Sequence, residues 1–292
     1  MKLVKQFRGA VWRALYSVSP ALTHQVSKRV SKTCWDNWGY RTRQVMASPD
    51  NAYIPRVPDA GKTINGYQIM HNGLKVLPGS YYGKGACRLF KKNRGVHEPQ
   101  EERIFQEVLK QLSPGAVMVE LGAFWAFYSM WFCQVVPQAR AFLVEPLTEN
   151  LRFGQKNFEA NGMQGHFTQA LVGQHPGTAP DGTRIICVDD FVVENALDRI
   201  AILHSDIQGF EIEMLHGAER TIRGGKISYY FISTHSEDLH QACETLLRKH
   251  NLVLLDSIPP AESFSVDGIL TARASHAPVI PPLSISRKKR ES

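Results

Sequence analysis

Four side chains that can transfer protons or bind hydroxyl groups stand near the end of short apolar runs: Glu120, Glu145, Asp206 and His235. Carboxylates accept hydrogen bonds from hydroxyl groups, and an imidazole exchanges a proton near neutral pH. If each run is a strand of one parallel sheet, its carboxyl end lies at the edge where such sheets bind ligands. The sequence therefore predicts that the four side chains converge on one site.

The stretch Val117–Ser129 reads V-M-V-E-L-G-A-F-W-A-F-Y-S and has the pattern of a strand, a tight turn and a helix. Gly122 and Ala123 are small enough for a ligand to approach the turn, and the first N–H groups of the following helix are free to bind it. In nucleotide-binding folds, an acid that binds the ribose follows about 20 residues later. Glu145 occupies that position, and we predict that it binds ribose hydroxyl groups.

The turn does not match the G-x-G-x-x-G pattern of dinucleotide-binding folds. Only the first glycine, Gly122, is present, and Phe124 and Phe127 stand at the later positions. Bulky side chains there would obstruct a pyrophosphate group pressed against the helix. A cofactor that has no phosphate, such as S-adenosylmethionine, does not need that approach.

A second turn follows the run that ends at Ser205 and reads S-D-I-Q-G-F-E. Gly209 permits a tight turn, so Asp206 is placed as a base, a metal ligand or a group that positions the cation of a ligand. On a neighbouring strand, His235 would take a proton from a substrate hydroxyl group. Either side chain can instead cap the helix that follows it. We predict Asp206 and His235 as the catalytic residues and assign no metal site.

Strands and helices alternate from residue 98 to residue 272, which is typical of an α/β fold. The apolar runs predict strands at residues 117–121, 141–145, 166–172, 184–188, 200–205, 229–233, 252–256 and 264–272. The segments between them predict helices at residues 100–112, 124–136, 148–161, 210–223 and 238–250, and a short helix that starts at Asp189. This order indicates a doubly wound, mainly parallel sheet with helices on both faces.

Residues 1–97 are predicted to form an extension of this domain. Apolar residues recur at helical spacing between Val4 and Val18. They indicate an amphipathic helix that docks on the domain or lies on a membrane surface, or else a transit peptide. Residues 31–65 are interpreted as an irregular connection, and residues 67–76 as a β-hairpin turned at Asn72-Gly73. The aromatic and basic segment 79–95 either binds sugar or phosphate or is a surface loop.

Basic residues are concentrated toward the two ends of the chain, although the formal net charge is only +7. Residues 1–100 contain 17 Lys and Arg against 4 Asp and Glu, whereas residues 101–286 contain 13 against 22. A basic leading segment is either a solvated arm or a contact with an anionic membrane, a phosphorylated glycosyl carrier or nucleic acid. Residues 276–292 are predicted to form a basic, disordered tail.

The five cysteines are scattered and include no C-x-x-C pair. This usage argues for a reducing compartment and against both a disulfide framework and a structural zinc site. No run approaches the length of a membrane span, and the first 20 residues lack the apolar core of a signal peptide. We therefore expect a cytoplasmic protein and keep peripheral contact with the inner membrane as an alternative. The sequence does not predict an oligomeric state.

Together these motifs resemble the FkbM-type methyltransferases, a class I family that depends on S-adenosylmethionine. The matching pieces are E-P-Q-E-E, E-L-G-A-F-W-A-F-Y-S, V-E-P, D-D-F and S-D-I-Q-G-F-E-I-E-M-L-H-G-A, and the last is the most specific. The resemblance implies a methyltransferase domain over residues 98–275. It also implies a Rossmann-like, seven-stranded sheet with a reversed last strand, which residues 264–272 could supply.

The resemblance further implies O-methylation, typically of a hydroxyl group on a sugar or polyketide, so a small molecule or glycan is the expected partner. Carried over by position, the cofactor-binding residues are Glu120, Gly122 and Ala123 at the methionine part, Glu145 at the ribose and Asp206 in the methyl-transfer zone. The chain departs from the usual Asn, Gly and Glu of the family at Phe124, Ala126 and Gln208.

Two other functions fit parts of the sequence. One is a non-catalytic protein that binds glycans or a membrane surface and retains a degenerate methyltransferase fold. The other is a nucleic-acid methyltransferase, which the basic arm and the aromatic and basic segment 79–95 suggest. The chain lacks an N-P-P-Y-like motif of amino-methylating enzymes, and its positive charge lies away from the predicted core. Nucleic acid is therefore not the expected partner.

Overall fold

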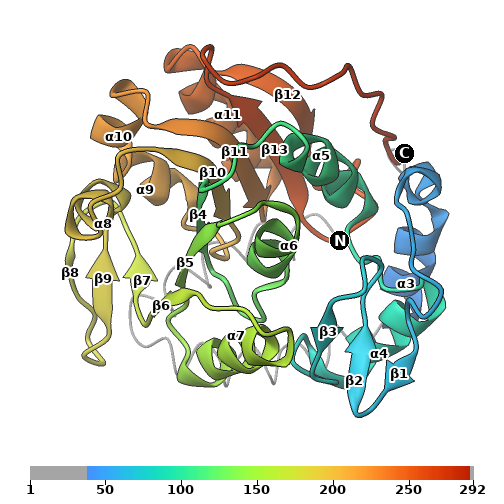
Figure 1. The fold of residues 1–292 in the computed structure, drawn as a ribbon. Coiled ribbons are helices and arrows are strands. Elements are labelled where there is room, and N and C mark those ends of the chain that lie inside the picture. Colours follow the sequence, from blue (N-terminus) through green and yellow to red (C-terminus); the bar gives the residue numbers. More distant parts are fainter. Residues whose placement is uncertain (1–37, 290–292) are drawn as a thin grey trace.

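The computed structural model describes residues 38–289 of the chain (Figure 1). The amphipathic helix predicted between Val4 and Val18 lies outside the described residues. None of the helices between residues 38 and 289 combines the length and the apolar character that a membrane span requires.

A seven-stranded sheet forms the centre of the molecule, in the order β12-β13-β11-β10-β4-β5-β6. Its strands are β4 (Val117–Leu121), β5 (Arg140–Val144), β6 (His166–Thr168), β10 (Ile200–Ser205), β11 (Ile227–Thr234), β12 (Val253–Ile258) and β13 (Gly268–Arg273). The pairs from β11 to β6 are parallel, and β13 runs antiparallel to both of its neighbours. The predicted Rossmann-like, class I methyltransferase topology with one reversed strand is therefore confirmed.

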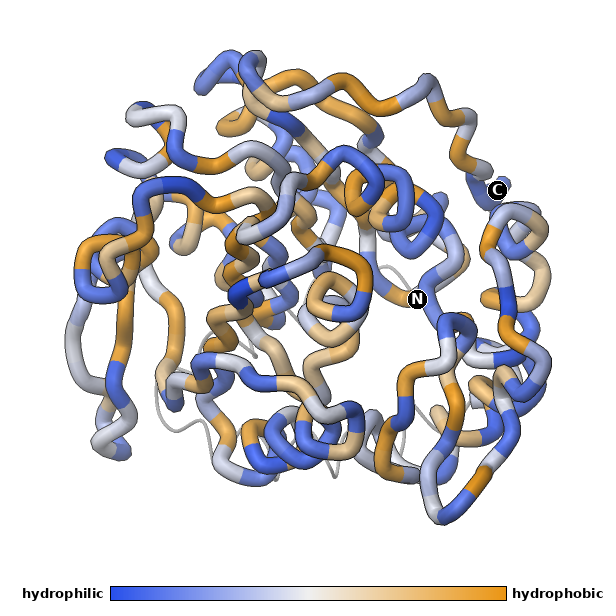
Figure 2. Tube along the Cα trace, viewed as in Figure 1, coloured by the Kyte–Doolittle hydropathy of each residue, from blue (hydrophilic) through white to orange (hydrophobic). Residues whose placement is uncertain are grey.

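Alternate residues of the strands face two separate hydrophobic cores. Met118 belongs to the core under α5 (Pro99–Leu109), α6 (Phe127–Val135) and α7 (Thr148–Ala160). Val117 and Val119 belong to the core under α8 (Val188–Glu194), α9 (Glu211–His216), α10 (Glu219–Arg223) and α11 (Glu237–Lys249). Hydrophobic residues accordingly follow the central strands in Figure 2. Helices on both faces make the sheet doubly wound, as predicted.

Two predicted elements are split in the structure. The helix expected over 210–223 divides into α9 and α10, and a Cβ at Gly217 between them would lie only 2.5 Å from the carbonyl oxygen of Gly173. The strand expected over 166–172 divides into β6 and β7 (Leu171–Val172). Strand β7 leaves the central sheet and pairs with β9 (Arg184–Ile186), which also pairs with β8 (Gly177–Thr178). Both splits make room for this small side sheet.

The segment before the central sheet contains more helix than the sequence predicted. Its elements are α3 (Trp38–Ala47), the 3₁₀ helix η1 (Pro49–Tyr53), β1 (Thr63–Ile64), β2 (Tyr67–Ile69), β3 (Lys75–Val76) and α4 (Gly83–Lys92). The β2 and β3 hairpin is confirmed. The irregular connection predicted over 31–65 is wrong where α3 and η1 form, and its residues 31–37 lie outside the described residues. The surface loop predicted over 79–95 is wrong because α4 forms there and packs against α3. Gly85 permits this packing, since a Cβ would lie 2.2 Å from the indole of Trp38.

The predicted domain boundary at residue 97 does not separate two hydrophobic cores. Met70, Leu74 and Leu89 from the leading segment belong to the same buried cluster as Phe105 of α5 and Trp131 of α6. In Figure 1 the leading elements, in blue and cyan, lie beside α5 and α6. The segment is thus an integral layer of the fold.

The predicted disorder of the C-terminal tail is wrong for residues 276–289. Ile280 and Ile285 are buried, and Arg287 contacts Asp256 of β12 at 2.7 Å. In Figure 1 this segment, in red, runs from the β12 side of the sheet to a position beside α3. We call residues 279–289 the C-terminal strap.

Candidate active site

The turn after β4 touches the turn after β10, which is the point where the strand order of the sheet reverses. Gly122 has a φ of +76°, and a Cβ on it would lie 1.9 Å from the carbonyl oxygen of Asp206. Only glycine permits this approach of two backbones. Ligands of doubly wound sheets bind at such a reversal point.

The N–H groups of the first turn are used inside the protein. Those of Gly122 and Ala123 both donate to the carbonyl oxygen of Val144, at 2.8 and 3.0 Å. The N–H of Phe124 donates to Glu145 Oε2 at 3.1 Å, and that of Ala126 donates to the carbonyl oxygen of Ala123. These four groups are not available to a pyrophosphate, and the turn therefore suits a cofactor that has no phosphate.

Glu145 follows β5 and points toward the same turn. Its Oε1 accepts hydrogen bonds from Leu147 N and from the Asn150 amide, whereas Oε2 accepts only the bond from Phe124 N among the described residues. Burial raises the pKa of Glu145 to about 7, although the hydrogen bonds from Leu147, Phe124 and Asn150 oppose this rise. Oε2 therefore retains capacity to accept a further hydrogen bond beside Gly122.

Glu120 is placed differently from the other predicted site residues. It lies on the face of β4 that is covered by α6, where its Oε2 accepts the N–H of Ser129 at 3.1 Å. Burial raises its pKa, and the nearby imidazole of His204 opposes the rise only in part. Glu120 therefore contacts the first turn of α6 and orients it beside the Gly122 turn.

The structure brings Asp206 and His235 together, as the strand ends predicted. Asp206 Oδ1 lies 3.1 Å from His235 Nε2. The other carboxylate oxygen, Oδ2, has no hydrogen-bond partner among the described residues, and the side chain is 32% exposed. One oxygen is therefore held by the protein and the other faces the site.

Three further residues complete this cluster. Glu211 Oε1 lies 3.1 Å from His235 Nδ1, and Asp267 Oδ1 lies 3.6 Å from His235 Nε2. The amide of Gln208 contacts both Asp206 Oδ1 and His235 Nε2. The sequence placed Gln208 and Glu211 in the right turn without assigning them a contact. It missed Asp267 because strand β13 was predicted to begin at residue 264, ahead of this side chain.

Burial and close charges set the pKa values of the cluster. Burial opposes ionisation of His235, but Glu211, Asp267 and Asp206 outweigh it and raise the pKa of His235 well above its usual value. Burial would raise the pKa of Asp206, but the hydrogen bond and charge of His235 lower it. The pKa of Asp267 is raised by burial, which His235 opposes. The site is compact and rich in carboxylates.

Aromatic residues of the leading segment form a wall beside this centre. The ring of Phe124 lies 5.5 Å from that of Tyr81 and 5.2 Å from that of Tyr82, between centroids. Arg41 of α3 donates a hydrogen bond to the Tyr81 hydroxyl at 3.2 Å. Burial raises the pKa of both phenols, and Asp206 and Asp267 add to the rise, so the wall lies within electrostatic reach of the acidic cluster. The sequence singled out the segment 79–95 as aromatic and basic, but it did not predict that this segment lies beside the Asp206 and His235 cluster.

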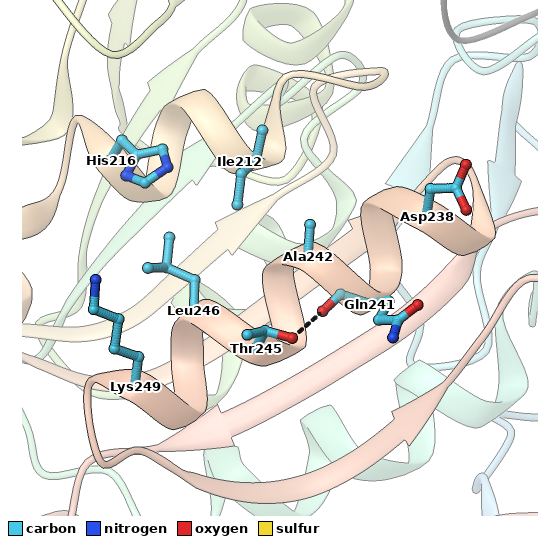
Figure 3. A pocket seen from close by; sticks show the side chains of 8 residues that line it. All are labelled: Ile212, His216, Asp238, Gln241, Ala242, Thr245, Leu246 and Lys249. Carbon is cyan, nitrogen blue, oxygen red and sulfur yellow. Dashed lines mark hydrogen bonds between the residues drawn. The ribbon is translucent and has the colours of Figure 1, made fainter.

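A separate groove of about 560 Å³ lies between α9 and α11 (Figure 3). Its lining includes Ile212, His216, Asp238 and Lys249. The groove contains none of the residues of the Asp206 and His235 cluster. It is therefore distinct from the site at the strand ends.

One protein-family model matches the part of the chain that contains Asp206 and His235. Residues 148–253 match the family model described as the methyltransferase FkbM domain. This part of the chain is similar to the FkbM methyltransferase domain. The resemblance read from the sequence is confirmed over these residues. The matched residues of the FkbM domain include Asp206 and His235, whereas the turn at Gly122 and the carboxylate of Glu145 precede them.

Among solved structures, the chain is similar to several methyltransferases. A ribosomal protein L11 methylase from Lactobacillus delbrueckii subsp. bulgaricus is 7% identical, with a TM-score of 0.43 over 62% of this chain and 81% of that one. A precorrin-6y C5,15-methyltransferase from Geobacter metallireducens is 16% identical, with a TM-score of 0.40 over 59% and 88%. TrmK from M. capricolum, in complex with S-adenosyl-homocysteine, is 14% identical, with a TM-score of 0.40 over 59% and 68%. No curated protein matches the chain.

Proposed function

We propose that the protein transfers a methyl group from S-adenosylmethionine to a hydroxyl group of a sugar, a glycan or a related secondary metabolite. The observation that supports this proposal most directly is the position of Asp206. It lies in backbone contact with the Gly122 turn, and its Oδ2 atom has no hydrogen-bond partner among the described residues. A cofactor at the turn and an acceptor hydroxyl group at this oxygen would be neighbours.

The cofactor would be held by the turn and by Glu145. Gly122 and Ala123 offer a backbone surface without bulky side chains, and Glu145 Oε2 has capacity for a ribose hydroxyl group. S-adenosylmethionine supplies an electrophilic methyl group on a sulfonium centre when it is bound. The carboxylates near the turn would favour this cation electrostatically. Glu120 would act indirectly, because its carboxylate is bound to Ser129 N.

Asp206 would orient the acceptor and take its proton. The Oδ2 atom accepts the hydrogen bond of the acceptor hydroxyl group, which directs a lone pair of the oxygen toward the methyl group. The acidity of that hydroxyl group rises steeply as its oxygen forms the new bond, so an ionised carboxylate is a sufficient base. His235 holds Oδ1 of Asp206 and thereby fixes the direction of Oδ2. We propose His235 as a positioning residue.

The surroundings of Asp206 support a sugar-like acceptor. Tyr81, Tyr82 and Phe124 present aromatic rings on one side, and Asp206 and Asp267 present carboxylates close by. Aromatic rings pack on the apolar face of a sugar ring, and carboxylates accept hydrogen bonds from its hydroxyl groups. This combination favours a polyhydroxylated acceptor over a flat apolar one.

The first prediction separates the two roles in this proposal. Calorimetry with S-adenosylmethionine should show binding that weakens at least tenfold in Glu145→Ala, because one charged hydrogen-bond acceptor is lost. Asp206→Asn removes one carboxylate that favours the cation, so it should weaken binding less than Glu145→Ala does, but it should lose about 10²-fold to 10⁴-fold in methyl transfer to a panel of sugars. Transfer is followed by the release of S-adenosylhomocysteine.

The exposed carboxylate of Asp198 provides the control, and Asp198→Asn should change neither quantity. Full methyl transfer by Asp206→Asn would show that Asp206 is not the base. Unchanged binding of S-adenosylmethionine by Glu145→Ala would show that Glu145 does not contact the ribose. If the native chain does not bind S-adenosylmethionine at all, the non-catalytic glycan-binding alternative replaces this proposal.

A further inference from the structure

Three polar groups converge on one nitrogen atom of His235. Nε2 lies 3.1 Å from Asp206 Oδ1, 3.6 Å from Asp267 Oδ1 and 2.9 Å from the terminal amide of Gln208. The same amide lies 2.8 Å from Asp206 Oδ1. The four side chains come from the turns after β10 and β11 and from the residue before β13, which all meet at one edge of the sheet.

While Asp206 is ionised, protons alone do not satisfy this arrangement. If the Gln208 amide donates to both Asp206 Oδ1 and His235 Nε2, the last two atoms face each other at 3.1 Å as unprotonated acceptors. If Nε2 carries a proton for Asp206, it faces the amide donor at 2.9 Å. Each assignment leaves one side of the triangle repulsive, and the cost of such a contact is high for poorly solvated groups.

A cation resolves the same triangle. A half-turn of the Gln208 amide presents its oxygen in place of its nitrogen, so that electron-pair donors of Gln208, Asp206 and His235 lie in mutual contact, with Asp267 Oδ1 beside His235 Nε2. Ligands bound to a metal at about 2.1 Å lie about 3.0 Å apart along the edge of an octahedron. The observed contacts of 2.8, 2.9 and 3.1 Å have this length, and the contact to Asp267 at 3.6 Å is slightly longer.

The other nitrogen of the imidazole, Nδ1, faces a buried carboxylate. Nδ1 of His235 lies 3.1 Å from Glu211 Oε1, and Glu211 is itself fully buried. The Glu211 carboxylate also accepts the N–H groups of Ile207 and Gly209. A carboxylate on one ring nitrogen fixes the tautomer that leaves the opposite nitrogen free to bind a metal.

We propose that Asp206, His235, Asp267 and Gln208 bind one divalent cation. Asp206, Glu211 and His235 offer ligand atoms within 4.8 Å of one another. Because Glu211 lies beside Nδ1, on the other side of the ring from Nε2, we assign it to orienting the imidazole and not to the ion. One nitrogen and three oxygen donors suit a first-row divalent ion such as Mn²⁺ better than Ca²⁺. The role of this ion rests on the proposed function: it would lie beside the acceptor hydroxyl group and make that group more acidic.

The test is a titration of the full chain with Mn²⁺ after treatment with a chelator, without S-adenosylmethionine. Electron paramagnetic resonance should show one bound Mn²⁺ per chain, and Asp267→Asn should weaken its binding at least tenfold. Gln208→Ala should also weaken Mn²⁺ binding. Because Gln208 is a half-buried turn residue, this variant tests the cation site even if Asp267→Asn fails to fold. In the separate groove of Figure 3, Asp238 provides the control, and Asp238→Asn should leave the affinity unchanged.

Absence of a bound Mn²⁺ in the native chain, or equal affinity in the native chain and both cluster variants, would overturn the cation site. Calorimetry with S-adenosylmethionine on the same samples separates this result from failure of the proposed function. Cofactor binding without Mn²⁺ binding removes only the cation site. Mn²⁺ binding that depends on Asp267, without cofactor binding, supports the cation site and removes the methyltransferase proposal.

Discussion

Gly122 shows how one residue can fix the geometry of the site. Its backbone touches that of Asp206, so the cofactor turn and the proposed base are held at a set separation. Two effects exclude a side chain here: the positive φ of +76° and the collision of a Cβ with the Asp206 carbonyl. Gly115 has nearly the same φ, +77°, but open space around its Cβ position.

The second prediction uses this pair of glycines. Gly115→Ala should lower the free energy of unfolding by about 1–2 kcal/mol, which is the cost of a left-handed conformation for an L-residue. Gly122→Ala should cost clearly more, about 3–5 kcal/mol, because the backbones must also separate. Urea unfolding measures both variants, and calorimetry should show weakened S-adenosylmethionine binding only in Gly122→Ala. Equal costs would show that the backbone contact contributes nothing.

The sequence predicted the residues of the site that lie at strand ends. Asp206 and His235 meet because parallel strands end at one edge of the sheet, and this follows from the order of apolar runs. Asp267 was missed, and Tyr82 was singled out without a position, because both positions depend on how loops and a leading helix fold over that edge. Periodicity along the chain carries no information about such contacts.

Helix α5 shows how an element joins the leading layer to the methyltransferase domain. Its residue Glu102 is fully buried and lies 2.7 Å from His97 Nδ1 and 3.3 Å from His71 Nε2. Its Oε1 also accepts the backbone N–H groups of His97 and Glu98. Burial alone would raise the pKa of Glu102, but the charge and hydrogen bonds of His97, together with the charge of His71, lower it to about 2.

The third prediction concerns this buried carboxylate. Glu102→Gln should lower the free energy of unfolding at pH 7 by about 3 kcal/mol, because the pKa of Glu102 is lowered from 4.5 to about 2 on folding. A lowered pKa stabilises the fold above the unfolded value and loses this contribution as the pH falls. The difference between native chain and variant should therefore shrink between pH 4.5 and pH 2, as measured by denaturant unfolding.

Glu107 on the same helix provides a control, since it is partly exposed and pairs only with Lys110, at 2.6 Å. Glu107→Gln should cost less than about 1 kcal/mol at pH 7. A pH-independent loss in Glu102→Gln would contradict the proposed origin of its stabilising effect.

Strands and helices were predicted correctly where apolar residues follow a regular pattern in the sequence. Strands β4 and β10 were predicted with their observed bounds, because buried parallel strands are short apolar runs between turns. Helices α3 and α4 were missed. Helix α4 reads G-K-G-A-C-R-L-F-K-K, and its two glycines disfavour a helix, yet packing of Ala86, Leu89 and Phe90 stabilises it.

At the scale of the whole molecule, the C-terminal strap connects three regions. Asp50 after α3 is fully buried, and its carboxylate accepts hydrogen bonds from Arg103 of α5 at 2.5 Å and from the N–H and hydroxyl groups of Ser286. Arg287 pairs with Asp256 of β12 and with Glu262. The strap thus contacts the leading layer, which is bound to α5 through Arg103, and also the edge of the sheet at β12.

The fourth prediction tests this connection. Asp50→Asn removes a buried charge that Arg103 needs, and it should lower the free energy of unfolding by about 3–5 kcal/mol. Trypsin should also cut faster after Arg287 and Lys288, because the strap loses its partner. The exposed pair of Asp59 and Lys62 serves as the control, and Asp59→Asn should leave both measurements nearly unchanged. Unaltered cleavage in Asp50→Asn would show that the strap is held elsewhere.

The strap also bears on the order in which the chain folds. The bond between Asp50 and Ser286 joins residues 236 positions apart, so it closes a loop that encloses nearly the whole described chain. Closure of so long a loop costs entropy and requires that α5 and the edge of the sheet already be in place. We therefore expect the strap to dock among the last events of folding. Its N–H groups would then become protected from hydrogen exchange only after the rest of the molecule has folded.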